Sequence, residues 1–111
     1  MATYTPKQLT AVTQLGTTIS TVYTVPSSTT TIIKQILLAN VTSSAATATI
    51  HFVPSAASAS ASNKIFGEIT ISANSTQLID MSAVLPTGAT IQARAGTATT
   101  VNIHVSGVES V

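Results

Sequence analysis

The chain has 111 residues, no cysteine and only 6% charged residues, with a net charge of +1. Globular domains average about 25% charged residues, so this surface must be built mainly from threonine, serine, asparagine and glutamine. The four lysine and arginine residues are too few for a basic patch that binds nucleic-acid phosphates. No apolar run reaches the ~20 residues of a membrane helix. We therefore expect no nucleic-acid partner, no membrane partner and no disulfide or thiolate metal site.

The length is typical of one domain, and we expect a single domain over residues 1–111. Residues 1–7 show no alternation of apolar and polar side chains. We interpret them as a possible N-terminal arm, which carries Tyr4 and Pro6 and can dock on a neighbour. They lack the basic start and apolar block of a secretory signal, so we expect no secretory export.

The segment 29–53 is rich in apolar and β-branched residues and lies between Pro26 and Pro54. We interpret it as a hairpin with arms at 32–41 and 46–52, joined by a turn of small residues. The second arm alternates cleanly. Its inward residues are expected to be Ala46, Ala48, Ile50 and Phe52, and its outward residues Thr47, Thr49 and His51.

The first arm of this hairpin is apolar on both faces, which suits a strand covered on both sides. We expect Ile33, Leu37 and Val41 to fill the core. The opposite face is then expected to contact a neighbouring subunit, or to be covered by another part of the same chain. Its residues are Ile32, Ile36 and Leu38.

The remaining strands follow from alternation and turn signals, and the serine- and alanine-rich run 55–63 is expected to be an exposed loop. Gly67 indicates a bulge, and Leu85-Pro86-Thr87-Gly88 is the strongest turn signal. Residues 106–111 are expected to be a tail. The further strands are expected at 8–14, 18–25, 64–72, 76–81, 90–95 and 99–105. About eight short strands predict an all-β fold, an antiparallel β-sandwich of the Ig-like or jelly-roll-like type, with a barrel as the alternative.

Chemical motifs are few. His51 and His104 would offer two nitrogen ligands to a metal only if their strands were paired, and we expect two ordinary exposed histidines instead. No nucleophile elbow or phosphate-binding glycine loop is present. Glu68 and Asp80 are the only plausible pair of catalytic carboxylates, but both fall near strand ends, where solvated acids are common. We therefore expect no enzyme activity, no metal and no cofactor.

Four stretches, in order, carry a resemblance to small β-sandwich virion proteins of tailed bacteriophages, the accessory subunits of head, neck or tail. They are Val-Tyr-Thr-Val-Pro-Ser (22–27), Ile-Ile-Lys-Gln-Ile-Leu-Leu-Ala-Asn (32–40), Val-Leu-Pro-Thr-Gly-Ala-Thr-Ile-Gln-Ala (84–93) and Ile-His-Val-Ser-Gly-Val-Glu (103–109). The resemblance implies an oligomeric structural subunit that is made in the host cytoplasm and attached to other virion proteins.

The sequence therefore predicts a capsid decoration, cement or head-fibre-like protein that acts by protein–protein association. The expected interface residues are Tyr4, Pro6, Ile32, Ile36 and Leu38. Two alternatives stay open. One is a tail-associated receptor-binding module that recognises a host-surface glycan through Tyr4 or Tyr23. The other is a small hydrolase or metal-dependent protein, which would require the two histidines to converge.

Overall fold

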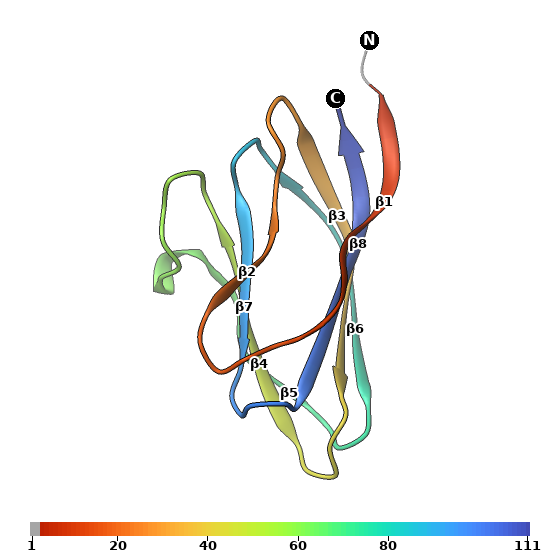
Figure 1. Cartoon of the computed structure of the whole chain (residues 1–111), viewed down its shortest axis with the longest axis vertical. Helices are drawn as coiled ribbons and strands as arrows, with labels where there is room; N and C mark the ends of the chain where they lie inside the picture. Colours follow the sequence, from red (N-terminus) through yellow and green to blue (C-terminus); the bar gives the residue numbers. More distant parts are fainter. Residues whose placement is uncertain (1–2) are drawn as a thin grey trace.

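The computed structural model describes residues 3–111, most of which form eight antiparallel strands in two four-stranded sheets (Figure 1). A short 3-10 helix, η1 (Ala61–Asn63), precedes β5. Within these described residues, no helix is long and apolar enough to cross a membrane. The predicted all-β sandwich is confirmed. Its strands are β1 (Tyr4–Gln14), β2 (Ser20–Thr24), β3 (Thr30–Asn40), β4 (Ala46–Val53), β5 (Lys64–Ile71), β6 (Thr76–Leu85), β7 (Thr90–Ala95) and β8 (Val101–Ser110).

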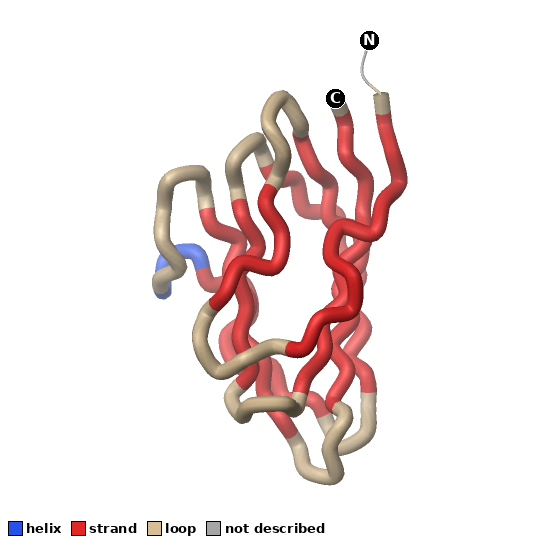
Figure 2. The backbone as a smooth tube through the Cα atoms, in the orientation of Figure 1, coloured by secondary structure: helices blue, strands red, loops and turns tan. Residues whose placement is uncertain are grey.

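The strand order identifies the sandwich as a jelly roll. Sheet A has the order β1-β8-β3-β6, and sheet B has the order β2-β7-β4-β5. Successive strands alternate between the two sheets, except that β4 and β5 are neighbours in sheet B. The loops that connect them gather mainly at the two ends of the sandwich (Figure 2). This eight-stranded order decides between the two sandwich types that the sequence left open.

The predicted hairpin over 29–53 is wrong. β3 pairs with β6 and β8 in sheet A, whereas β4 pairs with β5 and β7 in sheet B. The short link between β3 and β4 therefore carries the chain from one sheet to the other. A crossing between sheets and a hairpin turn use the same small residues, so the local pattern does not separate them.

The expected arm and tail are paired with each other. The first two residues of the arm lie outside the described residues, but from Tyr4 onward the segment is the strand β1. Tyr4 pairs with Ser110 and Lys7 pairs with Gly107, so the expected tail is the last part of β8. Each end segment thus supplies the hydrogen-bonding partner of the other, and the two strands lie side by side in Figure 1.

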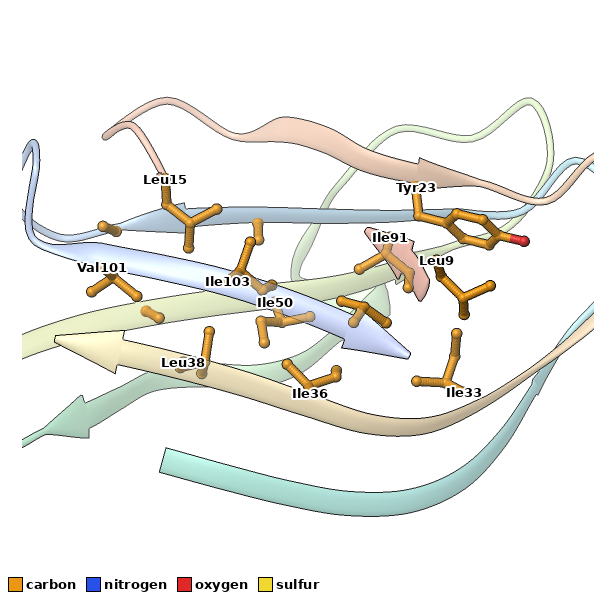
Figure 3. Close-up of a cluster of buried hydrophobic side chains, with 14 of the residues drawn as sticks. Leu9, Leu15, Tyr23, Ile33, Ile36, Leu38, Ile50, Ile91, Val101 and Ile103 are labelled. Carbon is orange, nitrogen blue, oxygen red and sulfur yellow. The ribbon is translucent and has the colours of Figure 1, made fainter. Parts of the chain in front are cut away.

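The core is one layer of mostly aliphatic side chains between the two sheets (Figure 3). The alternation predicted for β7 and β8 is confirmed, because their inward residues are fully buried: Ile91, Ala93, Ala95, Val101, Ile103 and Val105. In β4 the predicted inward residues are buried or packed against the core. Its Thr49 and His51, expected to be exposed, are also buried.

A β-bulge reverses the faces of β3 beyond Ile33. Ile33 pairs with Gly107 and Ile36 pairs with Val105, so three residue steps on β3 face two on β8. The extra residue turns the following side chains over. Ile36 is therefore fully buried, whereas Leu37, expected in the core, lies on the outer face and Val41 is 52% exposed. The sequence hides this bulge because both faces of the strand are apolar.

A second bulge lies where the sequence predicted one, at Gly67. Ala48 pairs with Ile69 and Ile50 pairs with Phe66, so β5 has one more residue than β4 across this point. Glu68 adopts a positive φ of 53° there. The loop before β5 is largely exposed, as predicted.

Candidate interaction surface

Large apolar side chains are exposed on the outer face of sheet A. Tyr4 and Val12 lie on β1, and Leu78 and Val84 lie on β6, the two edge strands of this sheet. Each of these four side chains is at least 50% exposed. A folded monomer tolerates scattered exposed apolar residues, but apolar residues that are contiguous indicate a contact surface.

Strand register aligns some of these residues in a first apolar row, here called the Ile32 row. Ile32 pairs with Val84 on β6 and with Val108 on β8. Val108 in turn pairs with Pro6 on β1. Residues directly opposite each other on antiparallel strands have adjacent side chains, so the row crosses all four strands of the sheet.

A second row, the Leu37 row, lies further along the same face. Leu37 pairs with Leu78 on one side and with His104 on the other. Val12, Leu37 and His104 line an open hollow of about 280 Å³. The Nδ1 atom of His104 is buried and has no hydrogen-bond partner within the described part of the chain.

A polar band separates the two rows at the position of the β3 bulge. Lys34 Nζ donates a 3.0 Å hydrogen bond to Ser82 Oγ. Gln35 Nε2 donates a 3.2 Å hydrogen bond to Asp80 Oδ1. With one cation and one carboxylate, the band has no net charge.

The structure divides the five predicted interface residues into two groups. Tyr4, Pro6 and Ile32 lie on strands of the outer face just described. The assignment of Ile36 and Leu38 to the interface is wrong, because both side chains are 0% exposed and belong to the intrachain core. The β3 bulge is the reason, since it exchanges the faces that the alternation predicted.

Sequence reasoning missed five apolar residues of this face: Val12, Leu37, Leu78, Val84 and Val108. Leu37 lies on this face and not in the core that the alternation predicts, because of the β3 bulge. Val84 and Val108 fell outside the expected strands 76–81 and 99–105. The alternation of Leu78, Asp80, Ser82 and Val84 with Ile79, Met81, Ala83 and Leu85 is the signal that would have extended β6.

A polar network joins the two sheets near the chain ends. The hydroxyl of Tyr23 on β2 donates to Glu109 Oε2 at 2.6 Å and lies 2.8 Å from Thr31 Oγ1. Lys7 Nζ forms an ion pair with Glu109 Oε1 at 3.2 Å. Burial, together with the hydrogen bond to Glu109, raises the pKa of Tyr23 to about 12. The bond from Tyr23 and then the Lys7 ammonium lower the pKa of Glu109, although burial opposes this.

This network removes one aromatic candidate for sugar binding. The Tyr23 ring is buried and lies at the same end of the core cluster as Leu9 and Ile33 in Figure 3. It cannot serve as the exposed aromatic platform that the glycan-binding alternative requires of it.

The two histidines lie in different sheets. His51 on β4 is buried, and its Nδ1 lies 2.9 Å from Asn63 Oδ1. His104 on β8 faces the hollow of the Leu37 row. Their strands are not paired, so the convergence considered from the sequence does not occur. Among residues 3–111 no three His, Asp or Glu side chains are grouped so that they could hold a metal ion.

Similarity to known proteins is found among solved structures. No family model matches the chain, and no curated protein matches it. Among solved structures, the fold is similar to a chain in the structure of infectious bursal disease virus Gx strain, with a TM-score of 0.49 and 13% sequence identity. The match covers 100% of this chain and 32% of the viral chain, so this chain spans about a third of the length of that protein.

Proposed function

We propose that this protein is a non-enzymatic structural subunit of a phage virion, a capsid decoration, cement or head-fibre-like protein that works by protein–protein association. The observation that carries the proposal is the pair of apolar rows on the outer face of sheet A. The proposed occupant of this face is a second copy of the chain, in a homo-oligomer that attaches to other virion proteins.

The composition of the face supports self-association. Two copies placed face to face bring apolar rows onto apolar rows when the two-fold axis lies in the plane of the interface and runs parallel or perpendicular to the rows. The polar band between the rows has Lys34 and Asp80 as its charged groups. Two such bands therefore meet without net repulsion, and each cation can approach the carboxylate of the other copy.

The low charge of the whole chain acts in the same direction. With 6% charged residues and a net charge of +1, two copies experience little electrostatic repulsion. Fully burying one large aliphatic side chain stabilises a complex by about 1.5–3 kcal/mol. Leu78 and Val84 are exposed, and Leu37 and Ile32 are half-buried, so their burial offsets part of the entropy lost on association.

The phage context comes from the sequence resemblance, and the jelly roll is compatible with it. Jelly rolls form viral capsid domains, but also lectin and cupin domains, so the architecture alone does not assign the role. In the proposed role the protein is made in the host cytoplasm and is then incorporated into the virion.

Light scattering after size exclusion, at two protein concentrations, tests the association. We expect the wild type to be an oligomer. Leu78→Asp and Val84→Asp should be folded, by circular dichroism, and monomeric, because each places a carboxylate in an apolar row. The matched control is Ile65→Asp, which changes a residue that is 48% exposed on β5 of sheet B.

Two results would contradict the proposal. A wild type that is monomeric at both concentrations would show that the protein does not self-associate. Dissociation by Ile65→Asp as complete as that by Leu78→Asp would show that the apolar rows of sheet A are not the contact surface.

A further inference from the structure

We propose that the outer face of sheet B binds an acidic sugar, a saccharide that bears a carboxylate, in an open hollow beside β4. The hollow has a volume of about 470 Å³ and is lined by nine residues, among them His51, Lys64 and Arg94. This size lies within the ~300–1,000 Å³ range of small-ligand sites. The proposal is independent of the assembly surface, which lies on the other sheet.

Strand register brings the cationic side chains to this hollow. Lys64 on β5 pairs with His51 on β4, and Arg94 on β7 pairs with Thr49, two residues along the same face. Lys64 and Arg94 are two of the four lysine and arginine residues of the whole chain. Neither forms an ion pair with a carboxylate within the described part of the chain, in contrast to Lys7.

The backbone of β5 helps to place the lysine. A side chain at Gly67 would have its Cβ 3.2 Å from Lys64 Cδ, so the glycine leaves room for the aliphatic part of the lysine to lie across the strand. Lys64 and Arg94 line the same hollow from the two strands on either side of β4.

The ring of His51 is held by a network that fixes its orientation. Asn63 Nδ2 donates to Ser58 O at 2.9 Å, and Asn63 Oδ1 accepts from Ser60 N at 2.9 Å. The oxygen of this amide therefore faces His51 Nδ1, 2.9 Å away, and Nδ1 must carry the hydrogen. Nε2 is then the ring nitrogen that is left for a ligand.

The other lining groups favour a sugar over a bare anion. Three residues that carry hydroxyls, Thr18, Thr49 and Ser60, line the hollow together with the apolar residue Ile19. A guanidinium binds a carboxylate through two parallel hydrogen bonds, and hydroxyls and an imidazole nitrogen match the hydroxyls of a sugar ring. Two cations suffice for one carboxylate but not for the repeated phosphates of a nucleic acid.

Titration of the ¹⁵N-labelled protein followed by NMR tests this site, with trigalacturonic acid as the probe and neutral galactotriose as its matched control. We expect trigalacturonic acid to shift the amide signals of Thr49, His51 and Arg94 in a saturable manner, and galactotriose to bind at least about fivefold more weakly. Arg94→Gln and Lys64→Gln should each weaken trigalacturonic acid at least about fivefold, because each removes a charge-assisted contact. Lys34→Gln, which removes a cation from sheet A, should leave the affinity unchanged.

Three results would overturn the inference. Equal binding of galactotriose would show that the carboxylate is not recognised. Equal binding of sodium sulfate would reduce the hollow to a simple anion site. A loss of affinity in Lys34→Gln as large as that in Arg94→Gln would show that only the net charge of the protein matters.

Discussion

The hydroxyl of Tyr23 lies 2.6 Å from Glu109 Oε2, so that one side chain of sheet B is bonded directly to a strand of sheet A. The same hydroxyl lies 2.8 Å from Thr31 Oγ1 on β3, and the other carboxylate oxygen of Glu109 faces Lys7 on β1. Tyr23 and Glu109 therefore connect β2 and β8 with each other, and connect them with Thr31 on β3 and Lys7 on β1. Such networks fix the relative positions of the elements that they join, because every polar group in them has a partner.

Removal of this hydroxyl should destabilise the protein. Tyr23→Phe keeps the buried ring but loses the hydrogen bonds to Glu109 and Thr31. Since one partner is charged, we expect the free energy of unfolding to fall by about 2 kcal/mol. Urea denaturation measures this change. The matched control is Tyr4→Phe, at a residue that is 65% exposed, where the change should stay within about 0.5 kcal/mol. Equal losses in the two variants would contradict the role given to the network.

The stability of the wild type should decrease in acid because of Glu109. The hydrogen bond from Tyr23 and the ion pair with Lys7 lower the pKa of Glu109 in the folded state. A group with a lowered folded pKa stabilises the fold above its unfolded pKa, about 4.3 for glutamate, and this contribution is lost as the pH falls from there toward the folded value. Glu109→Gln should therefore be less stable than the wild type at pH 7, and the difference should shrink at pH 3. A difference that is independent of pH would exclude this linkage.

The same pair predicts a loss of stability in alkali. The pKa of Tyr23 is raised to about 12, above the ordinary tyrosine value of about 10. The stability that Tyr23 contributes is complete below its pKa in the unfolded state and is lost as the pH rises through its pKa in the folded state. Unfolding measured between pH 9 and 12 should show a steeper decrease for the wild type than for Tyr23→Phe. Parallel curves would show that Tyr23 is not the group responsible.

Asn40 should be one of the most sensitive positions in the chain. Its side chain is 3% exposed, and its Oδ1 accepts hydrogen bonds from the backbone and side chain of Thr42 at 2.9 and 2.7 Å. Its Nδ2 faces the carbonyl oxygens of Ser44, Ile71 and Ser72 at 2.8–3.2 Å. These bonds connect the end of β3 in sheet A with the end of β5 in sheet B.

Asn40→Asp replaces the donor of this cluster with a carboxylate oxygen that faces three carbonyl oxygens. We expect thermal and urea denaturation to show a loss of about 3 kcal/mol or more. Asn40→Ala, which leaves the same carbonyls without a partner but adds no charge, should lose less. Ser43→Ala, at an exposed position in the same loop, is the control and should be nearly neutral. A small change in stability for Asn40→Asp would show that water takes over the hydrogen bonds that the amide donates to the three carbonyl oxygens.

Gly107 allows β8 and β3 to approach closely beside the bulge. A Cβ at this residue would clash with the carbonyl oxygen of Ile32 and would lie 3.1 Å from Leu9 Cδ1. Because the clash is with the backbone, Gly107→Ala must displace a strand, and we expect a loss of about 3 kcal/mol. Gly16→Ala is the control, since no atom lies within 4 Å of its Cβ position and a less flexible unfolded chain makes it neutral or slightly stabilising. Urea midpoints compare the two, and equal midpoints would contradict the clash.

The sequence predicts the strands of this fold and many of their buried residues much better than it predicts how the strands pair. Alternation identified the inward residues of β7 and β8 correctly, because each of these strands has one apolar and one polar face. It failed in β3, where both faces are apolar and a single inserted residue moved Ile36 and Leu38 into the core. It also placed β3 and β4 in one hairpin, because periodicity reports which side of a strand is buried and not which sheet contains the strand.

The candidate surfaces depend on these connections, and for that reason they were only partly predictable. The sequence predicts Tyr4 and Pro6 as contacts of an N-terminal arm and Ile32 from the second apolar face of its strand. Their common face follows instead from the pairing of β8 with β1 and β3, which brings the two ends of the chain together. The hollow near His51 depends on β4 lying between β5 and β7. Pairing between distant segments leaves no mark in either segment alone.

The pairing of the two chain ends also determines how the molecule responds to force. Tyr4 is opposite Ser110, and Thr3 and Val111 exchange backbone hydrogen bonds of 2.8 and 3.0 Å, so both described ends emerge at the same end of the sandwich (Figure 1). A load that pulls these ends apart acts across the antiparallel ladder and breaks its hydrogen bonds one after another, from the ends inward. The β1–β8 pair is therefore loaded as a zipper, whereas a load applied along the strands would have to shear many hydrogen bonds at once.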